Sequence, residues 1–304
     1  MVSAVQTVAV GDDLTVNRLG LGTMSLTGAG VWGEPRDPES ARRVLRRARE
    51  LGVDFFDTAD SYGPGVAETL VSDALSPYHD LVIATKGGLT RQGPGRWSRN
   101  CRPEYLRSAC EASLRRLGVD RIDLYQLHTV DPAVPLEVSL GALVELQAEG
   151  KIRHIGICNV SVPELERALA VAPVASVQNR LSLADRSSLA LAALCERNGI
   201  AFVAWAPLGK GALAGEDRTL AGIAPDLGAT SAQVALAWLL HVSPTTIPIP
   251  GTASVAHLEE NVGARALRVD PDLVSELARH AYRSRPGPRR PKRVMRRMAA
   301  WVRR

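Results

Sequence analysis

The sequence predicts a (β/α)8 TIM barrel, preceded by an N-terminal β-hairpin and followed by a basic C-terminal tail. Strand and helix patterns alternate eight times across residues 19–262, which favours a closed parallel barrel over an open sheet. A second observation concerns the first apolar run, Leu19–Met24, whose two glycines lie inside the expected strand. An open dinucleotide-binding sheet would instead need a Gly-x-Gly-x-x-Gly turn that opens a helix. The closed barrel is therefore the predicted fold.

The elements follow in order from local patterns. Residues 5–16 alternate loosely around a Gly-Asp-Asp turn, which indicates a hairpin. Short apolar runs bounded by turn residues predict the barrel strands: Leu19–Met24, Val53–Phe56, Leu81–Thr85, Ile122–Leu127, Ile152–Ile157, Ala175–Gln178, Ile200–Ala204 and Thr245–Ile249. Helical periodicity predicts helices at 38–51, 66–75, 103–117, 136–149, 162–171, 186–197, 231–240 and 254–262. Prolines at first-turn positions and glycines just after several of these ranges are typical of helix starts and ends.

Composition limits the class of protein. The chain has 304 residues, 45% of them apolar, and no apolar stretch approaches the ~18 residues needed to span a bilayer. The N-terminus lacks the features of a signal peptide, and the four cysteines show no metal-ligand spacing. We therefore expect a cytoplasmic protein with no membrane span and no metal site, in which residues 1–282 form the barrel domain.

The formal net charge of +5 comes from the C-terminal tail, residues 283–304. This tail holds ten of the 37 basic residues and no acidic residue, so the rest of the chain is net acidic. Its proline-rich first half is typical of a linker, and residues 291–304 fit a short amphipathic helix. Docking on the acidic barrel, or disorder, is the plainer interpretation, and binding of an anionic partner is the alternative. A primary role in nucleic-acid binding is disfavoured by the acidic body.

Three consecutive strands of the expected barrel end in residues that suit catalysis. Asp57 follows the second strand, Lys86 ends the third and His128 ends the fourth, while Tyr62 lies in the loop after Asp57. Barrel enzymes carry their chemistry at this end of the strands. Each residue alone also has a structural interpretation. Lysine, however, is almost never buried without a partner, and Asp57 is the expected counter-ion of Lys86.

This tetrad of Asp57, Tyr62, Lys86 and His128 suggests proton transfer to a carbonyl oxygen. A lysine ammonium beside the tyrosine hydroxyl is expected to lower the tyrosine pKa from its usual value of about 10, which would let Tyr62 act as the general acid. A neutral His128 would orient the carbonyl oxygen. Protonation is half of a reduction, and no side chain supplies the hydride, so the chemistry requires a nicotinamide cofactor.

The motifs around these residues resemble those of the aldo-keto reductase superfamily over residues 15–280. The matching stretches are Asp57-Thr58-Ala59-Asp60-Ser61-Tyr62-Gly63, Ala84-Thr85-Lys86-Gly87-Gly88, residues 113–124, Gln126-Leu127-His128, residues 150–156, Ala206-Pro207-Leu208-Gly209, Ile249-Pro250-Gly251-Thr252 and Leu258-Glu259-Glu260-Asn261. The resemblance implies an NADPH-dependent oxidoreductase that reduces an aldehyde or ketone to an alcohol. It also implies the catalytic roles of the tetrad, with Tyr62 as general acid.

The resemblance further implies which residues contact the cofactor. Asn159 and Gln178 match the groups that hold the nicotinamide carboxamide, and Trp205 matches the aromatic residue on which the ring stacks. One loop matches the segment that closes over the pyrophosphate, and the last loop and helix match the adenosine contacts. The remaining expected contacts are Gly22, Thr23, Met24, Ala206, Pro207, Leu208, Gly209, Gly211, Gly251, Thr252, His257, Glu260 and Asn261.

Two positions depart from the family pattern. Cys158 stands where serine is usual, and a thiol is a weaker hydrogen-bond donor. Residues 251–257 lack the lysine or arginine that family members commonly place near the 2′-phosphate of NADPH. Thr252, Ser254 and His257, helped by a helix N-terminus, are the substitutes that remain. NADPH is the expected cofactor, with NADH as the alternative.

The expected substrate is an apolar small-molecule carbonyl compound. Met24 and Trp32 after the first strand, and Trp97 in the loop 91–97, are candidates for a pocket wall above Tyr62. The short segment 209–230 suggests an open cofactor clamp. Two alternatives remain. The first is a cofactor-binding regulatory or sensor protein of the same fold, like the potassium-channel β-subunits that resemble this family. The second is a biosynthetic reductase selective for an imine or a sugar-nucleotide ketone.

Overall fold

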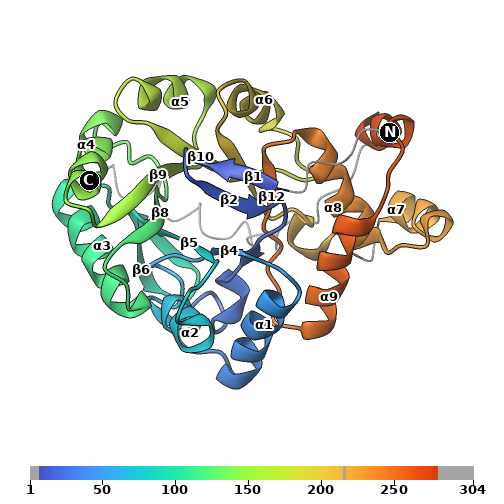
Figure 1. Cartoon of the computed structure of the whole chain (residues 1–304), viewed down its shortest axis with the longest axis horizontal. Coiled ribbons are helices and arrows are strands. Elements are labelled where there is room, and N and C mark those ends of the chain that lie inside the picture. Colours follow the sequence, from blue (N-terminus) through green and yellow to red (C-terminus); the bar gives the residue numbers. More distant parts are fainter. Residues whose placement is uncertain (1–6, 215–216, 280–304) are drawn as a thin grey trace, which may run out of the picture.

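The computed structural model describes residues 7–214 and 217–279, and it confirms the predicted barrel. Eight parallel strands in the order β12-β11-β10-β9-β8-β5-β4-β3 are ringed by helices (Figure 1). Backbone hydrogen bonds from Gly20 N to Pro248 O (3.0 Å) and from Gly22 N to Pro250 O (3.5 Å) join the two ends of this sheet. The strands are β3 (Leu21–Gly22), β4 (Phe55–Asp57), β5 (Val82–Gly87), β8 (Ile122–Leu127), β9 (Ile152–Cys158), β10 (Val174–Arg180), β11 (Ala201–Trp205) and β12 (Thr246–Pro248).

All eight predicted helices are present, within a few residues of their expected bounds. They are α1 (Pro38–Glu50), α2 (Val66–Leu75), α3 (Pro103–Leu117), α4 (Leu136–Ala148), α5 (Val162–Leu169), α6 (Leu189–Arg197), α8 (Ser231–Val242) and α9 (Val255–Gly263). The sequence interpretation missed two short helices, α7 (Arg218–Ile223) and α10 (Pro271–Arg279). Segment 209–230, from whose shortness the sequence suggests an open cofactor clamp, is thus partly helical.

Side-chain caps explain why several helices begin where they do. Asp37 Oδ1 accepts a hydrogen bond from Ser40 N (2.9 Å), with a proline in the first turn of α1. Thr230 and Gln233 form a reciprocal capping box at the start of α8. Such caps satisfy backbone N–H groups that have no partner within the helix.

The predicted N-terminal hairpin fills the end of the barrel opposite the candidate site. Its strands β1 (Thr7–Val10) and β2 (Leu14–Asn17) pair antiparallel and lie across the barrel axis (Figure 1). Val8, Val10 and Val16 are buried against Phe55 and the other side chains of the barrel interior. The alternating apolar residues of the hairpin therefore close the N-terminal end of the barrel, which we call the floor.

The first strand is shorter than predicted. Only Leu21–Gly22 pairs with β4, and Met24–Leu26 forms the 3-10 helix η1 instead of continuing the strand. Thr23 explains the break, because both its backbone N (2.9 Å) and its Oγ1 (3.1 Å) donate to Asp57 O. These bonds fix the chain against β4, and the following residues turn outward to the rim.

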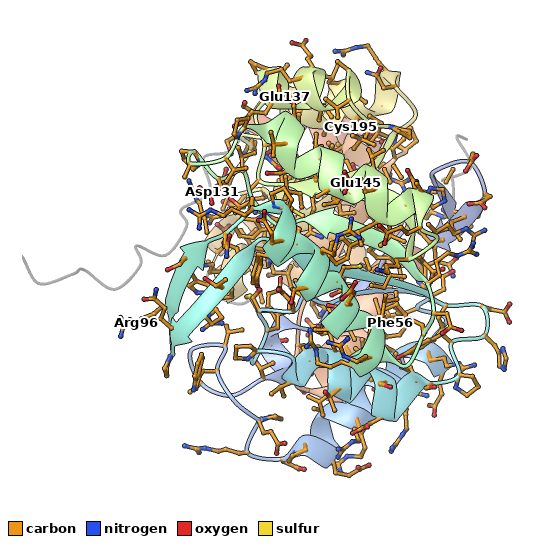
Figure 2. The ribbon with its side chains drawn as sticks, turned by 90° about the vertical axis from the view of Figure 1, so that its left-hand side faces the viewer. Phe56, Arg96, Asp131, Glu137, Glu145 and Cys195 are labelled. Carbon is orange, nitrogen blue, oxygen red and sulfur yellow. The ribbon has the colours of Figure 1, made fainter. Side chains whose placement is uncertain are left out.

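A second hairpin, β6 (Leu89–Gly93) and β7 (Arg96–Arg99), occupies the stretch that we had expected to be a loop. Its signal was the Pro94-Gly95 pair between two short polar runs, a typical turn sequence. The hairpin projects from the body of the barrel, with Arg96 near its tip (Figure 2), and the next residue of β7 is Trp97. It therefore presents a rigid strand where the sequence suggested an irregular segment.

Within residues 7–214 and 217–279, no helix has the length and apolar character required to cross a membrane. The basic tail, residues 283–304, lies outside the described residues, as does the beginning of the predicted first hairpin.

Candidate active site

Asp57 and Lys86 form a buried ion pair at the carboxyl ends of β4 and β5. Lys86 Nζ lies 2.6 Å from Asp57 Oδ2, and the two side chains are 0% and 2% exposed. Nζ also donates to Thr58 O (2.8 Å). Burial alone would lower the pKa of Lys86, but Asp57 and then Tyr62 raise it above its usual value. The site therefore holds a permanent ammonium charge out of contact with water.

Tyr62 lies over this ammonium, with Lys86 Nζ 5.2 Å from the centre of its ring. The expectation of a lowered tyrosine pKa is wrong for this structure. Burial is the largest influence and raises the pKa of Tyr62 to about 12, while Lys86 opposes the rise only in part. The sequence argument counted the neighbouring charge and omitted the cost of burying a phenolate. The tyrosine hydroxyl consequently keeps its proton at neutral pH.

His128 completes the predicted tetrad directly after β8. Its ring lies 5.8 Å from the Tyr62 ring, centre to centre, in an edge-on arrangement. Its Nδ1 is 3.4 Å from the hydroxyl of Ser61. Burial, followed by the nearby Lys86 charge, lowers the pKa of His128 well below its usual value. The imidazole is therefore neutral, as the sequence argument required.

Two glutamines hold the other oxygen of Asp57, and one of them was not predicted as a site residue. Gln178 Nε2 donates to Asp57 Oδ1 (2.7 Å), and Gln126 Nε2 donates to the same atom (3.3 Å). Gln126 is completely buried. Strand periodicity contained the signal, because Gln126 is two residues before His128 and so lies on the same strand face. The pair fixes the carboxylate that anchors Lys86.

Asn159 and Trp205 lie together beside His128. Trp205 Nε1 donates to Asn159 Oδ1 (3.0 Å), and Asn159 Nδ2 donates to His128 O (3.0 Å). Cys158, the preceding residue, is buried and its Sγ is 3.5 Å from Gln126 Oε1. Burial raises the pKa of this thiol, which argues against a reactive cysteine.

The loop after β11 has an unusual backbone. Ala206, Gly209, Lys210 and Gly211 all have positive φ angles, between 50° and 91°. Gly211 faces open space, with nothing within 4 Å of the position that a Cβ would take. Pro207 and Leu208 lie between these residues, in the turn that leads into η2 (Gly209–Gly211). The amides of Gly209 and Gly211 bond within the loop, to Ala206 O (2.9 Å) and Leu208 O (3.0 Å), while Lys210 and Gly211 expose their backbone to a ligand.

The loop after β12 leads into the N-terminus of α9. Thr252 Oγ1 accepts a hydrogen bond from Ser254 N (3.0 Å), and Ser254 Oγ accepts one from His257 N (3.4 Å). His257 is exposed, and Gly251 packs closely against Gly22 of β3. These residues form a polar rim at the N-terminus of α9, which Ser254 caps.

Two of the predicted cofactor contacts, Thr23 and Asn261, have buried side chains. Thr23 is fully buried, and its hydroxyl is directed to Asp57 O. Asn261 is also buried, on the inner side of α9. The backbone carbonyl of Glu260 accepts a hydrogen bond from Gln233 Nε2 (3.0 Å), which ties this part of α9 to α8. Periodicity alone could not separate these packing roles from ligand contacts.

The predicted substrate residues gather at the barrel mouth. Met24, Trp32 and Trp97 are three of the four large apolar side chains that are exposed among the described residues, at 44%, 38% and 38%. Trp97 meets the Tyr62 ring edge-on, with 6.5 Å between ring centres. The mouth above Tyr62 thus has an aromatic wall.

Comparison with known proteins defines the class of protein. The family model described as the aldo/keto reductase family matches residues 18–281. The chain is 46% identical over 271 residues to "Uncharacterized oxidoreductase C215.11c" of Schizosaccharomyces pombe, covering 89% of this chain and 88% of that protein. It is 42% identical over 270 residues to pyridoxine 4-dehydrogenase of Escherichia coli, covering 86% and 94%.

A solved structure of a relative has the same fold. An aldo-keto reductase from Klebsiella pneumoniae, crystallised with NADPH, superimposes with a TM-score of 0.78 at 28% identity, covering 95% of this chain and 98% of that one. The chain belongs to the aldo/keto reductase family and is an oxidoreductase.

Proposed function

We propose that this protein is an NADPH-dependent carbonyl reductase in which Tyr62 donates the proton. The observation that supports this most strongly is the buried Asp57–Lys86 pair beneath a protonated tyrosine, with a neutral imidazole beside the ring. A buried charge of this kind is costly to maintain for stability alone. Its position beneath the ring of Tyr62 argues for a catalytic use.

In this proposal, the raised pKa of Tyr62 keeps its proton in place until a carbonyl oxygen needs it. As the proton leaves, negative charge develops on the phenolic oxygen beside the Lys86 ammonium, which stabilises it without any rearrangement of solvent. Asp57 keeps that ammonium charged and fixed. In the tautomer in which Ser61 donates to Nδ1, His128 keeps its proton on Nε2 and donates a hydrogen bond to the substrate oxygen.

The residues near Trp205 fit a nicotinamide. Asn159 uses one amide proton and one lone pair in its bonds to His128 and Trp205, which leaves one of each for a carboxamide. The amide protons of Gln178 are directed to Asp57 and Gln126, so its oxygen is the atom left to accept a bond. A nicotinamide cofactor held there supplies the hydride that no side chain can supply.

NADPH is the proposed cofactor, although residues 251–257 contain no lysine or arginine. Ser254 caps the amide of His257, and Thr252 bonds to Ser254, so the remaining first-turn amides of α9 and the Ser254 hydroxyl are the groups offered to a 2′-phosphate. The Klebsiella relative crystallised with NADPH supports this choice. We expect a smaller preference over NADH than an arginine-lined site would give.

The proposed substrate is a planar aromatic aldehyde or ketone. The exposed rings of Trp32 and Trp97 suit stacking against an aromatic substrate. The name of the E. coli relative, pyridoxine 4-dehydrogenase, adds a specific candidate. Pyridoxal, the corresponding aromatic aldehyde, is therefore the first substrate to test.

The test compares Tyr62→Phe with a matched control, Tyr78→Phe. Tyr78 is half-buried far from the mouth, and its hydroxyl donates to Leu117 O (2.8 Å). NADPH oxidation is followed with pyridoxal and with 4-nitrobenzaldehyde, and NADPH binding is measured by fluorescence. We expect turnover in the wild type and in Tyr78→Phe, and a loss of about 10²–10⁴-fold in Tyr62→Phe with unchanged NADPH affinity. Binding without turnover on both aldehydes would instead favour the regulatory or sensor alternative.

A further inference from the structure

Arg91 is the most heavily bonded side chain at the barrel mouth, and the sequence analysis gave it no role. It lies on β6, directly opposite Trp97 of β7. All of its guanidinium nitrogens donate to backbone carbonyls. The acceptors are Arg96 O (3.3 Å, from Nε), Val31 O (2.6 Å) and Ser61 O (3.1 Å, both from Nη1), and Gly30 O (2.7 Å) and Gly93 O (3.3 Å, both from Nη2).

These five bonds use all five N–H groups that a guanidinium possesses. Arg91 therefore has no donor left for the carboxylate or phosphate of a substrate. The guanidinium also lies against Trp97, because Arg91 Cζ is 3.7 Å from the centre of that ring, and the centre of the Trp32 ring is 5.9 Å away. The guanidinium is thus placed to hold other groups rather than to bind a ligand.

The acceptors belong to three separate segments. Gly30 and Val31 are in the loop between η1 and α1, Ser61 is in the catalytic loop after β4, and the others are in the β6–β7 hairpin. Two backbone bonds reinforce the junction: Gly95 N donates to Gly30 O (2.8 Å), and Gly33 N donates to Gly63 O (2.8 Å). Arg91 therefore donates hydrogen bonds to all three segments.

We propose that Arg91 is a positioning residue that fixes Trp32 and Trp97 as a rigid wall over Tyr62, and that it thereby sets a preference for planar aromatic carbonyl substrates. The specificity part of this inference rests on the proposed reductase function. Trp97 is the link to the chemistry, since its ring meets that of Tyr62 edge-on at 6.5 Å. When the two tryptophans are already fixed, substrate binding does not have to immobilise their side chains. Less conformational entropy is then lost on binding.

Lysine cannot replace arginine in this role. An ammonium has three donors and no planar face, so it cannot reach carbonyls in three segments while stacking on an indole ring. Arg91→Lys keeps the charge and Arg91→Met keeps the apolar length, and both remove the planar guanidinium.

Arg96→Met is the matched control. Arg96 lies on the same hairpin, where its side chain is exposed and donates only to Gln92 Oε1 (3.4 Å) among the described contacts (Figure 2).

The experiment measures KM and kcat with NADPH for benzaldehyde and for propanal in the wild type and the three variants. We expect the KM for benzaldehyde to rise about tenfold in both Arg91 variants, the loss of one good stacking contact. The KM for propanal should stay within about twofold, and kcat should change by the same factor for both aldehydes, because Arg91 also bonds to Ser61 O in the catalytic loop. Arg96→Met should match the wild type. A KM rise that is equal for the two aldehydes, or none at all, would overturn the inference.

Two readouts do not depend on turnover. Acrylamide quenching of tryptophan fluorescence should increase in Arg91→Met, and this increase should disappear in a Trp97→Phe background. The Kd of benzaldehyde for the complex with oxidised cofactor should rise in parallel with KM. If the wild type reduces neither aldehyde, the proposed function fails, while the quenching still tests the positioning of Trp97. Unchanged quenching would contradict that positioning even in an active enzyme.

Discussion

The two ends of the barrel carry similar charged groups in opposite surroundings. At the floor, Asp13 of the N-terminal hairpin contacts Arg153 (Nη2–Oδ2, 2.5 Å) and His154 (Nε2–Oδ1, 2.6 Å). At the mouth, Asp57 contacts Lys86 at a similar distance, 2.6 Å. The side chain of Asp13 is 51% exposed, whereas that of Asp57 is 2% exposed.

This difference in burial separates a structural ion pair from a candidate catalytic one. Hydrogen bonds from Arg153 and then His154 lower the pKa of Asp13, but water screens these charges and such pairs contribute little. At the mouth, burial raises the pKa of Tyr62 and lowers that of His128, so both groups hold the protonation state that the proposed carbonyl reduction needs. Residue type alone does not distinguish the two ends.

The largest effect should come from removing the buried cation. Lys86→Met leaves Asp57 as an unpaired charge in the barrel, which we expect to destabilise the fold by roughly 3–5 kcal/mol. Activity should fall by at least about 10²-fold, because nothing then stabilises charge on Tyr62. Urea unfolding and steady-state kinetics measure the two losses.

The double variant Asp57→Asn/Lys86→Met is the control for Lys86→Met. It should recover much of the stability, because no charge remains buried, and none of the activity. Recovery of activity in the double variant would contradict the role given to the ammonium.

An intermediate effect is expected at Asp60, a buried carboxyl that accepts a hydrogen bond from Tyr105 (2.8 Å). Burial raises its pKa from 3.8 to about 7. Between these values the folded state binds more protons than the unfolded state, so this group makes stability fall as pH rises from about 4 to about 7. Asp60→Asn should remove that fall.

The predicted difference can be measured by unfolding Asp60→Asn and the wild type at several pH values. Relative to the wild type, the variant should gain on the order of 2–4 kcal/mol between pH 4 and pH 8. A constant difference across this range would show that Asp60 titrates normally.

The smallest effect is expected at the floor. Asp13→Asn removes the charge that Arg153 and His154 contact, yet the group is exposed and lies at the far end of the barrel. Turnover should remain within about twofold of the wild type, and the urea midpoint should shift little. An activity loss comparable to that of Lys86→Met would refute the distinction between the two ends.

Much of the fold could be predicted because barrel strands and helices have strong local signals. The eight helices and the alternation of apolar runs depend on periodicity and caps, which the sequence contains directly. The shortened first strand could not be predicted, since it depends on bonds from Thr23 to Asp57, 34 residues away. The β6–β7 hairpin was missed because its strands are polar and short.

The candidate site also has features that could be predicted from the sequence and features that could not. The ends of consecutive strands converge in any barrel, so Asp57, Lys86 and His128 were accessible to sequence reasoning. The direction of the Tyr62 pKa shift was not, because burial is a property of the whole fold. Arg91 was also inaccessible, since its acceptors are backbone carbonyls that carry no residue-specific signal.

The most direct test of the claim that burial sets the protonation states at the mouth is the pH profile of kcat/KM, which reports the free enzyme. We predict a flat profile between about pH 6.5 and pH 9. Activity would be lost only above this range as Tyr62 ionises, or below it as His128 becomes charged. Asp60→Asn should show the same profile, because that carboxyl is bonded to Tyr105. A limb with an apparent pKa near 7 in both proteins would contradict the account.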